Sequence, residues 1–316
     1  MMLAAAGCER DVFPEDNTDV VDCWKWTAEA INAQISQPLR ALCFVDSVQG
    51  WAAGGAAIVS TSDGGLNWTV AHIQHPQGQM LWGVHFLNAD TGLAVGDSGR
   101  VLATVDGGST WTEQHITTGR LYDVHLVDSN QAWAVGTDGL YSSVDGGPWT
   151  IFQGAQFQIP ILADIHFVDE LNGWAVGVGG VILHTSDGGS RWIMQADLAT
   201  TALASVHFVD REQGWTVGTG GDLYHTVDGG TTWMSQLSPT SRLLYSVHFL
   251  DSNLGMIVGE AGAAYVTDDA GQTWQAVTTD TDQDLFGVQF VSATTAYVCG
   301  WGGTVLRLSL VEVTCP

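Results

Sequence analysis

The residues with the greatest capacity for chemistry occupy one position of a repeated pattern. Imidazole nitrogens bind metals and exchange protons near neutral pH, so a ring of histidines could form a metal or proton site. The pattern places each of these residues on a different innermost strand, around a channel too wide for five rings to meet on one ion. We therefore predict structural hydrogen bonding, with no metal and no cofactor. The residues at this position are Cys43, His85, His125, His166, His207, His248 and Gln289.

A second chemical motif is Gly96-Asp97-Ser98-Gly99, which is similar to the nucleophile motif of trypsin-like proteases. It aligns with Gly136-Thr137-Asp138-Gly139 and with further Gly-bounded segments one repeat apart. No His–Asp arrangement is expected around Ser98, and nucleophilic catalysis by serine needs one. The motif therefore predicts a turn and not a catalytic site.

Three acidic residues, Asp97, Asp138 and Glu260, are expected on one face of the molecule. Paired carboxylates on one face can hydrolyse glycosidic bonds, so a glycan-binding or glycoside-hydrolysing protein is the alternative function. Sialidase chemistry needs a cluster of arginines, and too few converge here. The leading interpretation is that the chain is not an enzyme.

Self-similarity shows which elements must position these residues. The segment LWGVHFLNADTGLAVGDSGRVLATVDGGSTW, which begins at Leu81, recurs as LASVHFVDREQGWTVGTGGDLYHTVDGGTTW from Leu203. Each repeat of about 41 residues contains four short strand signals bounded by Gly and Asp, as in one propeller blade. The pattern predicts an all-β, seven-bladed β-propeller with four-stranded antiparallel blades. The apolar residue that marks each repeat is Phe44, Phe86, Leu126, Phe167, Phe208, Phe249 or Phe290.

Six repeats end in an Asp box of the form Thr-x-Asp-x-Gly-x-x-Trp, for example Thr61 to Trp68. The carboxylate is expected to accept hydrogen bonds from its own turn, and the Trp to pack as an apolar plug. The seventh repeat lacks this motif, but Trp24-Lys25-Trp26-Thr27 supplies a matching fourth strand. We therefore predict that an N-terminal strand within residues 22–36 closes the last blade, and that residues 22–316 form a single domain.

One face of the predicted propeller is the preferred binding surface. The position that enters each innermost strand varies while the framework repeats, as in loops that carry function on a rigid scaffold. Simple packing at the channel mouth is the alternative explanation. The entering position is occupied by Arg40, Trp82, Tyr122, Ala163, Ala204, Tyr245 and Phe286, and the adjoining loops add Asp97, Arg100, Asp138, Glu260 and Trp301.

The charge and the cysteine content of the chain limit the partners and the cellular compartment that can be expected. The chain has 34 acidic and 9 basic residues, a net charge of -25, which excludes a nucleic-acid partner. Cys8 follows Ala5-Ala6-Gly7 as in a bacterial lipoprotein signal, so residues 1–21 are interpreted as a signal remnant and acidic tether. We expect an extracytoplasmic protein in the periplasm or at the cell surface, attached to a membrane only through a lipid on Cys8.

The other four cysteines, Cys23, Cys43, Cys299 and Cys315, are an even number in an exported chain and could form up to two disulfides. Three pairings are open, and a Cys23–Cys315 bridge would lock the seam between the chain ends.

The repeats of the form VHFVD…GWAVG…GGVILHTSDGG…W resemble the propeller family of photosystem II stability and assembly factors, within the wider sialidase-like Asp-box group. The resemblance covers residues 22–310. It implies a propeller that binds protein partners during assembly of a complex on the outer side of a membrane. Photosynthetic members present an Arg-rich patch, whereas the eight Arg residues of this chain are scattered along the sequence, as in related propellers of non-photosynthetic bacteria.

Overall fold

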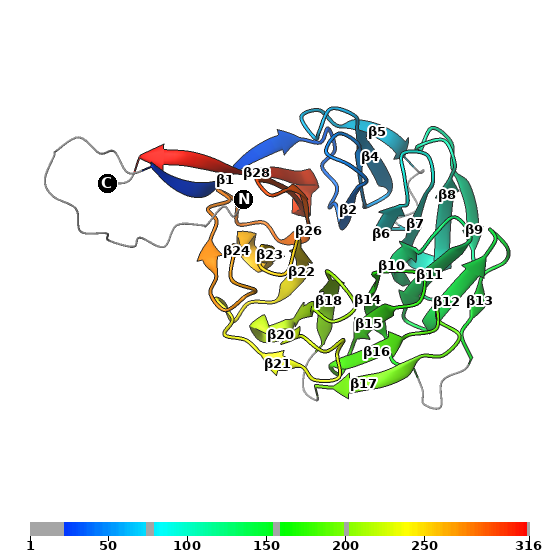
Figure 1. Ribbon diagram of the computed structural model, residues 1–316. Helices are drawn as coiled ribbons and strands as arrows, with labels where there is room; N and C mark the ends of the chain where they lie inside the picture. Colours follow the sequence, from blue (N-terminus) through cyan, green and yellow to red (C-terminus); the bar gives the residue numbers. More distant parts are fainter. Residues whose placement is uncertain (1–21, 74–78, 154–158, 199–201, 315–316) are drawn as a thin grey trace, which may run out of the picture.

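The computed structural model describes residues 22–73, 79–153, 159–198 and 202–314. In these residues the strands form seven four-stranded antiparallel sheets, arranged as blades around a central channel (Figure 1). The prediction of an all-β, seven-bladed propeller is confirmed. The second strand of a blade, such as β7 (Gly92–Gly96) or β15 (Gly173–Gly177), is buried at all five positions. It is apolar throughout because neighbouring blades cover both of its faces.

Blades are numbered here from the N-terminal side, with the innermost strand first. Blade 1 comprises β2 (Ala41–Phe44), β3 (Gly50–Gly54), β4 (Ala57–Thr61) and β5 (Thr69–Ile73). Blade 2 comprises β6 (Leu81–Phe86), β7 (Gly92–Gly96), β8 (Arg100–Thr104) and β9 (Thr112–His115). Blade 3 comprises β10 (Leu121–Leu126), β11 (Gln131–Gly136), β12 (Gly139–Val144) and β13 (Thr150–Ile151). Blade 4 comprises β14 (Leu162–Phe167), β15 (Gly173–Gly177), β16 (Val181–Thr185) and β17 (Ile193–Asp197). Blade 5 comprises β18 (Leu203–Phe208), β19 (Gly214–Gly218), β20 (Leu223–Thr226) and β21 (Met234–Ser235). Blade 6 comprises β22 (Leu244–Phe249), β23 (Gly255–Gly259), β24 (Ala264–Thr267) and β25 (Gln275–Ala276). Blade 7 comprises β26 (Leu285–Ser292), β27 (Thr295–Gly300), β28 (Thr304–Thr314) and β1 (Asp22–Asn32). Short 3₁₀ turns lie between the second and third strands of four blades, at η1 (Asp97–Gly99), η2 (Thr219–Gly221), η3 (Glu260–Gly262) and η4 (Trp301–Gly303).

The ring is closed by the N-terminal strand, as predicted. β1 pairs antiparallel with β28 over its whole length, from Asp22 opposite Thr314 to Asn32 opposite Thr304, and Figure 1 shows the two strands side by side. This pairing gives the seventh blade its fourth strand and covers an edge that would otherwise be free to pair with another chain.

The Asp boxes fasten the turn between the third and fourth strands of a blade. In the first box, Asp63 Oδ1 accepts two hydrogen bonds, one from Thr61 Oγ1 at 2.9 Å and one from the Asn67 amide at 2.9 Å. The Trp68 indole donates to the Gly65 carbonyl at 3.1 Å. The shortened copy in blade 3 forms a different turn, in which the Ser143 hydroxyl donates to the Gly147 carbonyl at 2.8 Å.

Aromatic rings pack within and between blades. The Trp68 ring meets Phe44 of its own blade edge-on at 5.8 Å, and Trp26 of β1 meets Phe290 in the same way at 5.7 Å. Trp26 is therefore the seventh-blade counterpart of the Asp-box tryptophans. Between blades the rings stack face to face, with Trp215 of blade 5 at 3.5 Å from Phe249 of blade 6. These contacts make the blades a continuous core.

Two of the four candidate disulfide cysteines are unpaired. Cys43 and Cys299 are buried free thiols, so the expectation that these two join disulfides is wrong, and a Cys23–Cys315 bridge stays a prediction. The Cys43 sulfur accepts a hydrogen bond from the Phe86 amide at 3.3 Å, which directs it toward blade 2 and away from the seam. The side chain of Cys23, and all of Cys8 and Cys315, lie outside the described residues. None of the described residues belongs to a helix long and apolar enough to cross a bilayer.

Candidate functional site

The residues predicted to enter the innermost strands surround one end of the channel. In blades 2 to 7 the register shifts after the first residue of the innermost strand, as between Leu81 and Gly83 in blade 2. Trp82 lies inside this shift and reaches the channel. The structure brings together all seven entering residues around one cavity of about 440 Å³. We call this ring the mouth; it consists of Arg40, Trp82, Tyr122, Ala163, Ala204, Tyr245 and Phe286.

Two arginines stack on the aromatic rings of the mouth. The guanidinium carbon of Arg40 lies 3.8 Å from the ring centroid of Phe286 and 4.6 Å from that of Trp82. The guanidinium carbon of Arg120 also lies 4.6 Å from the Trp82 centroid. Cations at such distances are attracted by the negative face of an aromatic ring. Arginines that are scattered in the sequence thus meet around Trp82, so the chain does present an arginine pair on this face.

Asp97 fixes the positions of Trp82 and Arg120. It accepts hydrogen bonds from the Trp82 indole at 3.0 Å, the Met80 amide at 2.9 Å and Arg120 Nε at 2.5 Å. Burial raises the pKa of Asp97, but the bonds from Met80, Arg120 and Trp82 outweigh it and hold the pKa below its usual value. Burial lowers the pKa of Arg120, and the contact with Asp97 more than offsets this. Asp97 is therefore a positioning group for the mouth and no free acid.

The aromatic arc continues through blades 6 and 7. The Tyr245 and Phe286 rings are 5.0 Å apart, and Phe286 meets the half-exposed Trp301 at 6.4 Å. Glu260 accepts a hydrogen bond from the Leu243 amide at 3.1 Å. Burial lowers the pKa of Arg40 more than the nearby Tyr245 raises it.

Two predicted residues stand apart from this cluster. Asp138 is exposed in the turn between β11 and β12, where it accepts a hydrogen bond from Thr117 Oγ1 at 2.6 Å. Arg100 does not belong to the binding face: it is only 3% exposed, and its Nε donates to Glu113 of the outer strand β9 at 2.9 Å. As the first residue of β8, it pairs in register with His115 of β9.

Sequence reasoning missed two contributors to the mouth. Arg120 precedes Tyr122 by two residues, and Asp284 precedes Phe286 by two. The Asp284 carboxylate accepts from the Ala261 amide at 3.0 Å, and its charge acts on Arg40 and Tyr245. Arg120 and Asp284 each lie two residues before a residue that enters an innermost strand, and this shared position in the repeat is the sequence signal that could have identified them.

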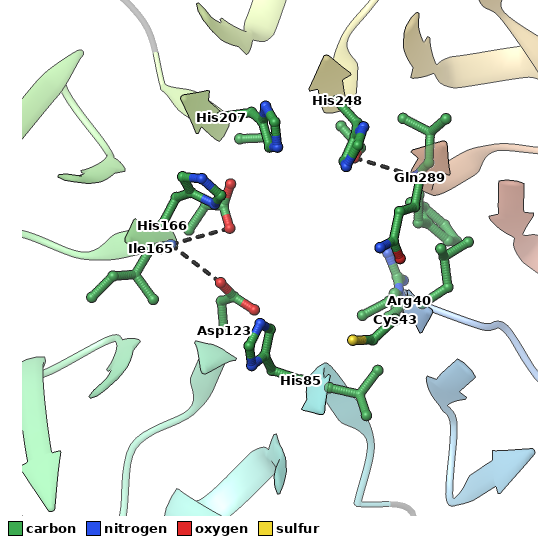
Figure 2. A pocket seen from close by; sticks show the side chains of 18 of the residues that line it. Arg40, Cys43, His85, Asp123, Ile165, His166, His207, His248 and Gln289 are labelled. Atoms are coloured by element: carbon green, nitrogen blue, oxygen red, sulfur yellow. Dashed lines mark hydrogen bonds between the residues drawn. The ribbon is translucent and has the colours of Figure 1, made fainter. Parts of the chain in front are cut away.

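Deeper in the channel, the histidine position joins neighbouring blades. His85 Nδ1 accepts from the Leu126 amide at 3.1 Å, and His166 Nε2 contacts the Phe208 carbonyl at 3.0 Å. Gln289 makes both bonds at once, accepting from the Phe44 amide at 2.7 Å and donating to its carbonyl at 3.0 Å. These bonds satisfy the innermost strand edges, which have no neighbouring strand. The prediction of structural hydrogen bonding is confirmed for His85, His166 and Gln289, whereas His248 Nδ1 is buried without a hydrogen-bond partner among the described residues. Figure 2 shows these side chains around the channel.

Burial also keeps the histidines neutral. It lowers the pKa of His85 to about 4 and that of His248 to about 3. Within the described ranges, no group of three or more His, Cys, Asp or Glu side chains could hold a metal ion.

Between the mouth and the histidines, a second layer of side chains also accepts hydrogen bonds from amides of the next blade. Asp164 Oδ2 accepts from the Val206 amide of the next blade at 2.7 Å, and Ser205 Oγ accepts from the Val247 amide at 3.4 Å. Asp123 occupies the corresponding position in blade 3.

The protease-like motif is a turn, as predicted. Ser98 lies in the η1 turn with a φ of 58°. His115 does approach it, but its Nδ1 contacts the Ser98 backbone oxygen at 2.8 Å, so the ring is not placed to take the hydroxyl proton.

The family model described as photosynthesis system II assembly factor YCF48 matches residues 18–118 and 142–284, which is more than half of the chain. No curated protein matches the chain significantly.

Solved structures share the fold at low sequence identity. A structure titled YCF48 bound to D1 peptide is 23% identical with a TM-score of 0.73, covering 89% of this chain and 96% of its own. YCF48 from Cyanidioschyzon merolae is 18% identical with a TM-score of 0.72, covering 90% and 99%. The WD40 propeller domain of Doa1 is 14% identical with a TM-score of 0.75, covering 90% and 97%. These likenesses show the propeller fold alone.

Proposed function

This chain belongs to the photosynthesis system II assembly factor YCF48 family, and from that premise we propose that it is a non-enzymatic propeller that binds a protein partner at its mouth. It acts as an assembly or stability factor, or as a structural subunit, of a membrane-associated complex outside the cytoplasm. A relative is described as bound to a D1 peptide, which supports a polypeptide as the ligand.

The observation that carries the proposal is the arginine–aromatic cluster of the mouth. Residues that dominate binding energy in protein interfaces are enriched in Trp, Tyr and Arg. Here Arg40 and Arg120 both lie over Trp82, and the half-exposed Trp301 extends the apolar surface beyond Phe286. The cluster is held in place by hydrogen bonds to Asp97 and by edge-on contacts between its aromatic rings, so little side-chain entropy is lost on binding.

The polar groups of the cluster favour an extended polypeptide over an apolar ligand. Arg40 lines the cavity and is only partly buried, so its guanidinium can donate hydrogen bonds to a partner carbonyl or carboxylate. Trp301 and Arg120 remain partly exposed on opposite sides of Trp82 in the blade order, which gives the ligand several contacts along an arc of the mouth.

The acids once considered for hydrolysis have structural partners. Asp97 bonds to Arg120 and Trp82, Glu260 to the Leu243 amide, and Asp138 to Thr117. A glycosidase needs one carboxyl group free to protonate the leaving oxygen and another free to act on the sugar or on water. The geometry therefore supports binding better than hydrolysis.

The proposed location rests on sequence context. Cys8 after Ala5-Ala6-Gly7 supports a lipid anchor, and the acidic segment that follows supports a tether that presents the propeller near a membrane. Globomycin-sensitive processing and labelling with radioactive palmitate would test the anchor; an unlabelled protein would remove it from the proposal.

A pull-down from native membranes tests the function. The wild type is compared with the variant Trp82→Ala/Tyr245→Ala/Trp301→Ala, and retained proteins and glycans are identified by mass spectrometry. We expect a stoichiometric protein partner that the folded variant loses. The matched control is Ile193→Ala/Met234→Ala, which removes apolar side chains that are 49% and 51% exposed on the outer strands β17 and β21. Retention of the partner by the mouth variant, or recovery of glycans alone, would overturn the proposal.

A further inference from the structure

Two acidic side chains meet across the boundary between blades 3 and 4, just below the mouth. Asp123 on β10 and Asp164 on β14 occupy the same position in successive repeats. Both approach one amide group: Ile165 N lies 3.2 Å from Asp123 Oδ2 and 3.1 Å from Asp164 Oδ1. Figure 2 shows Asp123 directed toward Ile165 inside the ring of inner strands. Two carboxyl groups thus share one donor inside a cavity.

The structural task at this position does not require an acid. In blades 5 and 6, Ser205 and Ser246 accept the corresponding inter-blade hydrogen bonds from the Val247 and Val288 amides, each at 3.4 Å. The remaining blades carry Ala41, Gly83 and Gly287 there. Asp123 and Asp164 accept the same inter-blade bonds, from the Ile165 and Val206 amides, so the acidity of the pair is an addition to a task that a hydroxyl group performs in other blades.

No cation compensates the pair. Arg40 is the one Lys or Arg side chain among the described residues that line the cavity, and it stacks on Phe286 near Tyr245. The five histidines that line the channel are kept neutral by burial. The titratable and charged groups that face the pair are Tyr122 and His125 from β10, His166 from β14, His85 from β6, Cys43 from β2 with Arg40 just before it, His207 from β18, and Tyr245 and His248 from β22.

Burial raises the pKa of Asp123 well above its ordinary value, and the charge and hydrogen bonding of Asp164 raise it further. Two like charges side by side within a cavity of low dielectric constant disfavour double ionisation. Asp123 therefore retains its proton under conditions in which isolated aspartates have lost theirs.

We propose that the Asp123–Asp164 pair is a proton-dependent clamp between blades 3 and 4. With one shared proton it holds the two innermost strands together beneath the mouth. Loss of that proton places two negative charges side by side and drives the strands apart. Because Tyr122 and Ala163 of the mouth directly precede the two aspartates, the clamp adjusts the shape of the mouth to pH. This inference concerns the free protein and does not depend on the identity of any partner.

The direction of the effect on stability follows from proton linkage. The folded chain keeps a proton that the unfolded chain releases above a pH of about 4. The stabilisation is complete below that pH and is lost as the pH rises through the folded-state pKa of Asp123. When the pH is high enough to ionise the carboxyl group in both the folded and the unfolded chain, the folding equilibrium constant is lower than at low pH. The reduction is about tenfold for each unit by which the folded-state pKa exceeds the unfolded-state pKa.

The test compares Tm and amide hydrogen exchange from pH 5 to pH 9 for the wild type, Asp123→Asn and Asp164→Asn. An Asn amide can donate to the remaining carboxylate and so replaces the shared proton at every pH. We expect the wild type to lose Tm toward pH 9, with faster exchange of the Ile165 and Val206 amides after correction for intrinsic rates. Both variants should lack this loss and exceed the wild type at pH 9.

The matched control is Asp138→Asn, which removes an exposed carboxylate on the same face and should leave the wild-type pH dependence unchanged. Should Asp123→Asn fold poorly, Asp123→Ser introduces the side chain found in blades 5 and 6. Infrared spectroscopy of the wild type at pH 7 adds an independent readout, the carbonyl stretch of a protonated aspartic acid. Parallel Tm curves for wild type and Asp123 variants, or absence of that band, would overturn the clamp.

Discussion

Removal of one tryptophan from the N-terminal strand should open the ring at its seam. Trp26 on β1 is 8% exposed and packs edge-on against Phe290 at 5.7 Å, within a cluster that joins blades 6 and 7. A Trp side chain buries about 150–250 Å², and at about 25 cal/mol/Å² this corresponds to about 4–6 kcal/mol. Trp→Ala changes in protein cores cost about 3–5 kcal/mol. We expect Trp26→Ala to lower the free energy of unfolding by about 4 kcal/mol.

The same strand supplies the control. Trp24 is two residues away and 41% exposed, so Trp24→Ala should cost about 1–2 kcal/mol. The free energies come from urea titrations monitored by circular dichroism. Hydrogen exchange monitored by mass spectrometry localises the effect: protection of β28 should fall in Trp26→Ala, while protection of β10 persists. Equal costs for the two variants, or uniform loss of protection in all blades, would refute the view that β1 seals the propeller.

Three further outcomes follow from the channel and its turns. Gln289→Ala leaves the Phe44 amide and carbonyl unsatisfied at the junction of blades 7 and 1, so urea titration should show a loss of about 2–3 kcal/mol, and Gln289→His should lose less. The folded-state pKa is about 4 for His85 and about 3 for His248, so below pH 6.5 the unfolded chain binds protons that the folded chain does not, and stability falls as the pH drops from 6.5 toward 4. His248→Gln removes one of these groups and should move the midpoint of acid unfolding to lower pH. An unchanged midpoint would contradict this prediction. Ala261 has a φ of 52° in the η3 turn, so Ala261→Gly should raise stability by about 0.5–1 kcal/mol in thermal unfolding, and a loss would show that this turn is unstrained.

The propeller was predictable because its determinants are local and repeated. The same apolar alternation, Asp box and Gly-bounded turn recur in each blade, so errors in any one copy do not change the interpretation. The N-terminal closure was also predictable, since Trp26 replaces the one missing Asp-box tryptophan. The entering residues of the mouth were found because the repeat aligns them, even though they differ in type.

The individual contacts of the mouth were harder to predict from the sequence. Arg40 and Arg120 are two repeats apart, and only the geometry of the ring brings them onto Trp82. Arg100 was placed on the wrong surface because the alignment gives its position in the repeat but not the side to which the first residue of β8 points. The Asp123–Asp164 pair could not be predicted from the sequence, because neither aspartate is unusual by itself and the two approach one amide only across two blades in a buried cavity.

Site-directed photo-cross-linking in native membranes tests the central claim, that a protein partner binds at the mouth. A photoreactive amino acid replaces Trp301 in one protein and Ile193 in another, since both positions are about half exposed but lie at the mouth and on an outer strand respectively. The account predicts a discrete cross-linked protein from position 301 and none from position 193, and competition by unlabelled wild type. Cross-links of equal yield from both positions, or no protein from position 301, would contradict it.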